Sequence, residues 1–316
     1  MSIPPETIDP RGGSIAALDT EAPPKVSVAI MTYNQREYLQ ECLDSILAQD
    51  YPNVEIVIAD DGSTDGSQEI AKLYAKRHPG RFVLKLSPMN CGITATANAA
   101  HFGCTGDYIS WMGGDDVMMP GKLRQQVELM ESDPSCVLCY HDLDVFLSTS
   151  GKTLYRFSER NKPREGDVRV AIRYGTFHGA CATMHRRRAA PQGGLDRRIQ
   201  HAADWLYWVE TLAGGGRIAY IDQVLGRYRR HDRNITSSPF VRSLIEDNIL
   251  SCVIMLKMLP RYAPEIFYAM SRNLVALARR SRGEGRGSMM VLALMVFSAF
   301  LLTLPFVALA RASSSR

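Results

Sequence analysis

Cysteine is sparse and irregularly placed in this chain of 316 residues, which has seven cysteines. An odd number without regular spacing argues against the disulfide framework of a small secreted protein. The one close pair, Cys136 and Cys139, lies in a strand-like segment, where side chains three residues apart point to opposite faces. No second Cys/His pair with zinc-ligand spacing accompanies it, so the sequence argues against a zinc or redox centre.

A secretory signal and a basic surface are also lacking. The apolar run 14–18 is too short for a signal peptide, which together with the cysteines favours a reduced cytoplasmic setting. The formal net charge of +4 comes from the tail: from Arg279 onward there are six arginines and one glutamate, a balance of +5, so the preceding residues sum to −1. This distribution removes the basic face that a nucleic-acid-binding protein needs.

What the chain does have is ordinary globular composition, with 46% hydrophobic and 22% charged residues. Residues 1–24 are rich in proline, glycine and acidic residues without periodicity, which predicts a mobile leader. From residue 26 onward, strand-like and helix-like patterns alternate. We expect strands at 26–33, 54–59, 82–86 and 108–112, and helices at 36–50, 67–77 and 94–102. This alternation predicts an α/β fold, a Rossmann-like and mostly parallel sheet flanked by helices.

The pattern continues less regularly to residue 238, so we place one domain at 25–238. The polar stretch 147–167 is expected to be a loop over the site. The remaining predicted elements are helices at 122–132, 169–174 and 204–212, and extended segments at 136–146, 178–184, 217–221 and 224–230.

The C-terminal part changes character. Residues 239–282 carry two amphipathic helices, which either pack on the domain or lie on a membrane surface. Residues 289–310 carry no charge and would span about 33 Å as a helix, which predicts a transmembrane or deeply inserted segment, with a buried core helix as the alternative. More arginines precede this segment than follow it, which predicts a location on the cytoplasmic face of the inner membrane.

Acidic residues follow two of the predicted strands. Asp60, Asp61 and Asp65 lie in Ile-Ala-Asp-Asp-Gly-Ser-Thr-Asp, and Asp115 and Asp116 close Gly-Gly-Asp-Asp. Both clusters would stand at the carboxyl edge of the sheet, where open α/β folds bind ligands. Turn formation is the alternative for Asp60 and Asp65, and for Asp65 we favour helix N-capping.

Together with Val-Ser-Val-Ala-Ile-Met-Thr-Tyr-Asn at 26–34, the first cluster resembles the inverting family 2 glycosyltransferases of GT-A fold, of the type that makes bacterial surface polysaccharides. The resemblance is dense from 26 to 134 and resumes from 201 to 234. It implies a nucleotide-sugar donor, with Asp61 accepting the imide N–H of a uracil or thymine ring, Tyr33 beside that ring, and Asp60 supporting the turn.

The resemblance also implies a divalent cation, Mn²⁺ or Mg²⁺, which offsets the charge on a leaving nucleoside diphosphate. The family's usual Asp-x-Asp is incomplete here, because Gly113 stands at the position of the first acid. We therefore expect Asp115 to bind the metal and Asp116 to orient the loop. A structural turn with solvated acids is the alternative.

For the general base, the resemblance points to Asp204 at the start of a predicted helix, with Ala203 in place of the usual glutamate. A helix cap is the alternative role, and Asp204 could fill both. The Tyr-Arg-Arg-His element suggests that His231, and less strongly Arg230, contact the diphosphate. Three weaker candidates for the acceptor site are His178, Asp142 and Trp205.

These features predict a metal-dependent inverting glycosyltransferase that uses a UDP-sugar or dTDP-sugar. The predicted anchor suggests a membrane-associated acceptor, such as a glycan or polyprenyl-linked intermediate. Two alternatives remain: a catalytically impaired nucleotide-sugar-binding scaffold, favoured by Gly113 and Ala203, and a nucleotidyltransferase. The latter usually has a glycine-rich phosphate loop, and residues 31–34 contain no glycine. A processive synthase is disfavoured because the chain has no Gln-x-x-Arg-Trp sequence.

Overall fold

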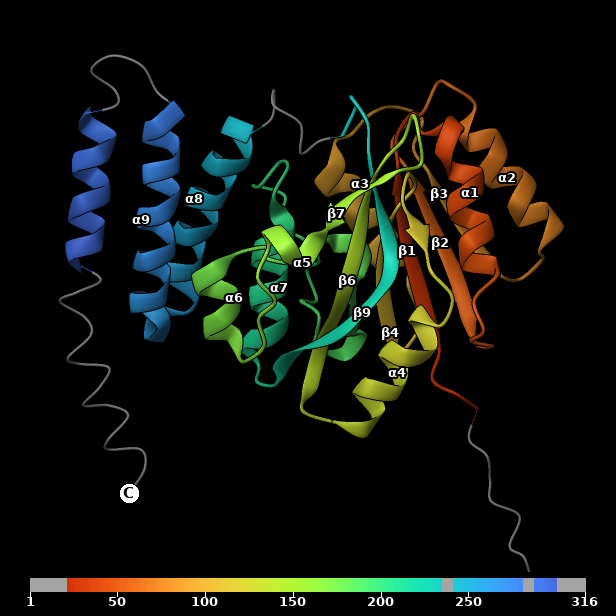
Figure 1. The fold of residues 1–316 in the computed structure, drawn as a ribbon, viewed down its shortest axis with the longest axis horizontal. Coiled ribbons are helices and arrows are strands. Elements are labelled where there is room, and N and C mark those ends of the chain that lie inside the picture. Colours follow the sequence, from red (N-terminus) through yellow and green to blue (C-terminus); the bar gives the residue numbers. More distant parts are fainter. Residues whose placement is uncertain (1–21, 235–240, 281–286, 300–316) are drawn as a thin grey trace, which may run out of the picture.

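A mixed sheet of nine strands runs through the molecule, with the strand order β3-β2-β1-β4-β8-β6-β9-β5 and with β7 paired to β6 (Figure 1). The computed structural model describes residues 22–234, 241–280 and 287–299. The predicted leader at 1–24 therefore lies almost wholly outside the described residues.

The first half of the sheet is parallel, as predicted. Its strands are β1 (Val26–Thr32), β2 (Val54–Asp60), β3 (Phe82–Leu86) and β4 (Tyr108–Gly113). β1 and β2 are almost wholly apolar and buried, the pattern of strands covered on both faces. The covering helices are α1 (Arg36–Leu47), α2 (Ser67–Arg77) and α3 (Ile93–Gly103). Figure 1 shows α1 and α2 on one side of these strands and α3 on the other.

The second half of the sheet is mixed, so the prediction of a mostly parallel sheet holds only for the first half. The long strands β6 (Cys136–Leu147) and β9 (Arg217–Arg230) run parallel to each other. Their antiparallel neighbours are the short strands β5 (Val117–Met118), β7 (Thr153–Arg156) and β8 (Thr183–Arg186). The two extended pieces predicted at 217–230 thus form one strand, and the predicted loop 147–167 contains β7.

Short helices fill the connections. They are α4 (Lys122–Ser132), α5 (Phe157–Arg160), α6 (Val168–Tyr174) and the 3₁₀ helices η1 (Ala180–Ala182), η2 (Arg187–Ala189) and η4 (Pro260–Tyr262). The strand predicted at 178–184 is replaced by η1 and begins only at Thr183.

The C-terminal helices stand beside this sheet domain. α7 (Ala203–Ala213) packs against α6, α8 (Val241–Met258) packs against α7, and α9 (Ala263–Arg280) packs against α6 and α8 (Figure 1). Apolar residues of α8 and α9 are buried in these contacts, among them Cys252, Met255 and Ile266. Both amphipathic helices therefore use their apolar faces within the molecule.

The predicted membrane location is wrong by this structure. Among the described residues, no helix is long and apolar enough to cross a bilayer. Residues 287–299 are helical, which at 1.5 Å per residue corresponds to about 20 Å, whereas a hydrocarbon core is about 30 Å thick. The rest of the predicted segment, 300–310, lies outside the described residues.

Candidate active site

The carboxyl ends of β1, β2 and β4 meet at one edge of the sheet. Thr32 pairs with Asp60 and Met31 pairs with Gly113. Backbone hydrogen bonds continue beyond the strands, from Asp61 N to Thr32 O at 3.0 Å and from Gly114 N to Met31 O at 2.9 Å. The two acidic clusters and Tyr33, which is 47% exposed, are therefore gathered at this edge.

Asp60 is occupied by its own turn. Oδ1 accepts hydrogen bonds from Ser63 N at 2.8 Å and Gln68 Nε2 at 2.7 Å, and Oδ2 accepts one from Ser63 Oγ at 2.6 Å. Asp65 likewise accepts from Arg36 N at 2.9 Å and from Ser67 N at 3.0 Å, so one carboxylate ties the starts of α1 and α2 together. Both side chains shape the loop in this structure.

Asp61 faces the N-terminus of α3. Oδ1 accepts from Cys91 N at 2.6 Å and Oδ2 accepts from Gly92 N at 3.0 Å, and Gly92 is the N-cap residue of that helix. A carboxylate is stabilised at a helix N-terminus because it meets unpaired N–H groups and the positive end of the helix dipole. Asp61 is thereby fixed at the sheet edge, where its backbone N–H donates to the carbonyl oxygen of Thr32, the residue before Tyr33.

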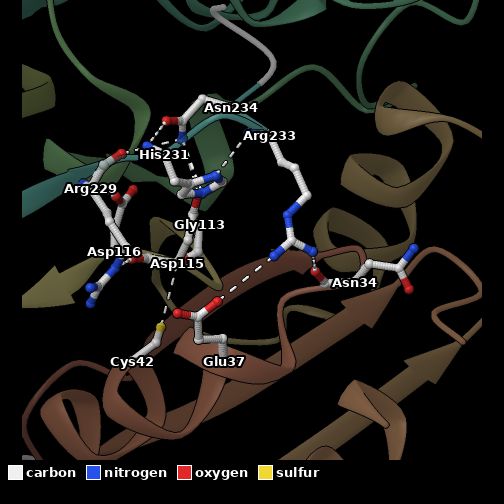
Figure 2. A network of polar contacts seen from close by, with 10 residues as sticks. All are labelled: Asn34, Glu37, Cys42, Gly113, Asp115, Asp116, Arg229, His231, Arg233 and Asn234. Atoms are coloured by element: carbon white, nitrogen blue, oxygen red, sulfur yellow. Dashed lines mark hydrogen bonds and ion pairs between the residues drawn. The ribbon is translucent and has the colours of Figure 1, made fainter. Parts of the chain in front are cut away.

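The Gly-Gly-Asp-Asp loop is held by the end of β9 (Figure 2). Asp115 Oδ2 lies 2.8 Å from His231 Nε2 and accepts a hydrogen bond from Asn234 Nδ2 at 3.3 Å. Asp116 Oδ1 accepts from Arg229 N at 2.9 Å, and Arg229 Nε donates to Asp115 O at 2.6 Å. The two neighbouring carboxylates therefore point to different partners.

The hydrogen bonds of His231 define its tautomer. Nδ1 accepts a hydrogen bond from Arg233 N at 3.1 Å, so the ring proton of the neutral form sits on Nε2, which donates to Asp115. The ring also stacks on Tyr38, with centroids 5.0 Å apart. In this arrangement, His231 orients the Asp115 carboxylate.

Burial sets the electrostatics of this loop. Desolvation and the neighbouring Asp115 carboxylate raise the pKa of Asp116 well above its usual range. The guanidinium of Arg229, which is 5% exposed and ion-paired with Glu41, offsets part of this rise. The pKa of Asp116 stays raised even with Arg229 beside it.

Gly113 also has a steric reason to lack a side chain. A Cβ at this position would lie 2.6 Å from Asp115 Oδ1 and 3.1 Å from Asp116 Oδ2. The acid that is absent from position 113 would therefore displace the two acids that follow it.

The donor set for a divalent cation is small. No group of three or more His, Cys, Asp or Glu side chains among the described residues is arranged to hold a metal. Asp115 provides a carboxylate at the sheet edge, and within the described ranges its Oδ1 accepts no protein hydrogen bond. Mg²⁺-type sites often use one or two carboxylates together with substrate phosphates and water. The residues present fit that kind of shared site.

Asp204 is the second residue of α7 and is partly buried. Desolvation raises its pKa to about 6, partly offset by the hydrogen bond that Oδ1 accepts from Trp205 N at 2.9 Å. The approach to α7 is tied to α3, because Thr94 Oγ1 donates to Ile199 O at 2.7 Å and to Gln200 O at 3.0 Å. The segment before Asp204 is therefore attached to the first turn of α3, and the N-terminus of the same helix binds Asp61.

The weaker acceptor candidates are engaged in the fold. Asp142 accepts from Leu143 N at 2.9 Å and from Ser158 N at 3.0 Å and Oγ at 2.6 Å, which holds α5. Trp205 is 2% exposed and donates from Nε1 to Ala171 O at 2.8 Å. His178 is buried among aromatic rings, and burial lowers its pKa to about 4. The hydrogen bonds of Asp142 and Trp205 thus join parts of the fold to one another.

Arg229 is the main residue that sequence reasoning missed. Arg229 and Arg230 are adjacent on β9, so their side chains point to opposite faces. Arg229 reaches the acidic loop, whereas the Arg230 guanidinium lies 5.7 Å from the centre of the Tyr228 ring. The sequence predicts that the two side chains lie on opposite faces of the strand, but it does not predict which face meets the acidic loop.

A second missed residue is Lys122, which is wholly buried beneath the loop. Its Nζ donates to Ser110 Oγ at 3.1 Å and to Cys181 O at 2.8 Å, and burial lowers its pKa to about 8. A lysine at a helix start carries no sequence signal of burial.

Comparison with known proteins identifies the family. The family model described as Glycosyl transferase family 2 matches residues 27–190. An uncharacterized protein of Mycobacterium tuberculosis is 31% identical over 218 residues, which cover 68% of this chain and 61% of that relative. The putative teichuronic acid biosynthesis glycosyltransferase TuaG of Bacillus subtilis is 28% identical over 215 residues, covering 68% of this chain and 82% of TuaG. The chain thus spans about three fifths of the length of the mycobacterial relative.

Solved structures show the same fold. S. aureus TarS 1-349 in complex with UDP-GlcNAc aligns with a TM-score of 0.68 at 18% identity, covering 86% of this chain and 80% of that one. The mannosyltransferase PcManGT from Pyrobaculum calidifontis, in complex with GDP-Man and Mn²⁺, aligns with a TM-score of 0.61 at 20% identity, covering 93% and 80%. The chain therefore belongs to glycosyl transferase family 2 and has the GT-A-like α/β fold, as its motifs predicted.

Proposed function

We propose that this protein transfers a sugar, with inversion, from a UDP-sugar or dTDP-sugar to a hydroxyl group of a glycan acceptor. One observation carries the proposal: Asp61, Asp115 and the approach to Asp204 are joined through neighbouring strand ends and the start of α3. Glycosyl transfer requires a donor site, a diphosphate site and a base to act on one substrate. The catalytic unit is residues 25–238, with α8 and α9 packed beside it.

The donor base binds at Asp61 and Tyr33. Asp61 uses one lone pair on each oxygen for the amides of Cys91 and Gly92, so a second lone pair can accept the imide N–H of uracil or thymine. The exposed ring of Tyr33 offers a flat apolar surface beside it. The UDP-GlcNAc complex of the TarS structure supports a uridine donor for this fold.

Asp115 is the residue that would hold Mn²⁺ or Mg²⁺. Such a cation would offset the negative charge on the departing nucleoside diphosphate. Asp116 and Arg229 fix the loop that carries Asp115, and His231 orients its carboxylate. Arg230, at the end of β9, is a further candidate for the diphosphate. The Mn²⁺ in the PcManGT complex supports a divalent cation in this fold.

Asp204 removes the acceptor proton. The acceptor oxygen forms a bond to the anomeric carbon as the bond from that carbon to the diphosphate breaks, and the hydroxyl proton passes to the Asp204 carboxylate. A pKa of about 6 suits this role, because the carboxylate is ionised at neutral pH and is a stronger base than an ordinary aspartate. The likeness to TuaG supports a polysaccharide acceptor.

The test is a panel of UDP-sugars and dTDP-sugars with a mixture of glycan acceptors, with and without Mn²⁺ or Mg²⁺, in which nucleotide release is measured. We expect release from at least one donor, and its loss after chelation and in Asp115→Ala. No release and no binding of any donor would reject the proposal. Tight donor binding without release would instead support the scaffold alternative, which Gly113 and Ala203 favour.

A further inference from the structure

The helix that carries the proposed base in its first turn has no side-chain cap from its N-cap residue. The N-cap residue of α7 is Ala202, whose side chain cannot accept a hydrogen bond. Asp204 Oδ1 accepts a hydrogen bond from its neighbour Trp205 N in this first turn. The backbone N–H groups of His201 and Ala202 lie before the helical hydrogen bonds begin, so they also need an acceptor from another part of the molecule.

Asp247 of α8 supplies that acceptor. Its Oδ2 accepts hydrogen bonds from His201 N at 2.7 Å and from Ala202 N at 3.2 Å, and it lies 3.5 Å from His201 Nδ1. The Asp247 side chain is 13% exposed, so these bonds are shielded from water. An ionised acceptor makes stronger hydrogen bonds than a neutral one, and a negative charge at a helix N-terminus is favourable.

The same segment is held from its other side. Thr94 Oγ1 on α3 donates to the carbonyl oxygens of Ile199 and Gln200. Residues 199–202 are thus bonded to α3 through their C=O groups and to α8 through their N–H groups. Asp204 follows two residues later, so its position relative to the donor site depends on both attachments.

We propose that Asp247 is a positioning residue for Asp204, which makes α8 a working part of the active site; this rests on the function proposed above. α8 lies beyond the residues that the family model matches. Asp247 thus brings a carboxylate to the backbone immediately before α7, two residues from Asp204.

The kinetic test compares Asp247→Ala, Asp247→Asn and the control Glu246→Gln in the full chain. Glu246 is on the same helix, half-exposed and paired only with Arg242 among the contacts seen here. We expect Asp247→Ala to lower kcat by about 10- to 100-fold, because small misplacements of a catalytic group have effects of that size, while the donor KM stays within about two-fold. Asp247→Asn keeps an amide oxygen as acceptor and should recover part of kcat. The control should match wild type.

Amide hydrogen exchange of residues 199–206 provides a readout that does not depend on turnover. We expect faster exchange of His201 and Ala202 in Asp247→Ala, partial protection in Asp247→Asn, and the wild-type rate in the control. Unchanged exchange would overturn the proposal, as would faster exchange with kcat unchanged, or an equal fall in kcat in the Asn and Ala variants. Absence of turnover by wild type with every donor would reject the proposed function, while the exchange rates would still decide whether Asp247 holds this segment.

Discussion

At the scale of single residues, Asp204 has two competing properties. Its folded-state pKa of about 6 lies above the usual value of 3.8, so between these values the folded protein binds a proton that the unfolded chain has released. The contribution of Asp204 to stability is therefore full below about pH 4 and is lost as the pH rises through 6. At neutral pH the ionised carboxylate is available as a base but destabilises the fold.

We predict that kcat/KM falls below about pH 6, because protonated Asp204 cannot accept the acceptor proton. Asp204→Asn should lower kcat by about 100- to 10,000-fold and leave donor affinity unchanged. At pH 7.5 the variant should be at least as stable as wild type in urea unfolding, because the desolvated charge is gone. A pH profile without a limb near 6, or a variant that turns over normally, would remove Asp204 from the base role.

Gly113 allows a second prediction at this scale. Gly113→Asp restores the family's acid but should lower kcat/KM by at least about 10-fold, because the new side chain meets Asp115 Oδ1 and adds a third carboxyl group beside a pair in which the pKa of Asp116 is already raised. Gly113→Ala carries the steric part alone, so the difference between the two variants reports the charge. Both are measured by steady-state kinetics together with the melting temperature. Higher activity in Gly113→Asp would show that the loop accommodates the missing acid.

At the scale of elements, the turn after β2 is docked against the segment before α3. Gly62 has φ of +73°, and a Cβ there would lie 2.3 Å from the backbone carbon of Met89. Gly80 has a similar φ of +81° but open space around it. Substitution of either glycine strains the backbone, but only a substitution at Gly62 also makes two loops collide. Comparing the two substitutions therefore measures the effect of the collision.

We predict that Gly62→Ala lowers the free energy of unfolding by about 2 kcal/mol or more beyond the effect of Gly80→Ala, since the turn must move away from a rigid backbone. Because Asp61 precedes this turn, donor binding should weaken in Gly62→Ala alone. Urea unfolding and calorimetric titration with UDP measure the two effects. Equal destabilisation by the two substitutions would mean that the loops are not in firm contact.

The elements that the sequence predicted well are those whose pattern is local. Helices at 36–50, 67–77 and 94–102 were found within a few residues, because the apolar period and the turn signals are properties of each segment itself. β7 was missed because a short edge strand depends on pairing with a strand that is distant in the sequence. The membrane prediction at 289–310 rested on hydropathy over 22 residues, of which the structure describes only 289–299.

The candidate site shows the same division. Asp61 and Asp115 could be placed because each follows an apolar strand, and parallel strands end at one edge. The contacts around these acids could not be predicted, because the Cys91 N–H that Asp61 accepts and the face of β9 that carries Arg229 depend on tertiary contacts. The same holds for the N–H groups that donate to Asp247. The sequence predicts where the acidic residues lie, whereas only the structure shows which of them accept hydrogen bonds from the protein itself.

At the scale of the whole molecule, the helices beyond residue 240 serve the sheet domain in two ways. α8 and α9 cover apolar side chains of α6 and α7, and α8 provides Asp247. The helix at 287–299 has one fully covered residue, Ala293, whereas its large apolar residues Leu294 and Met295 are more than 60% exposed. The two parts of the C-terminal region therefore contribute unequally to the fold.

Two truncations test this difference. A chain ending at residue 286 keeps α8 and α9, so we expect a melting temperature within about 5 °C of the full chain and unchanged turnover, since little buried surface is removed. A chain ending at residue 240 loses Asp247 and exposes the faces of α6 and α7, so we expect aggregation or a melting temperature lower by more than about 10 °C. Calorimetry and nucleotide release measure both outcomes. If the shorter chain were as stable and active as the longer one, the sheet domain would function alone, and neither α8 nor its carboxylate would be part of the active unit.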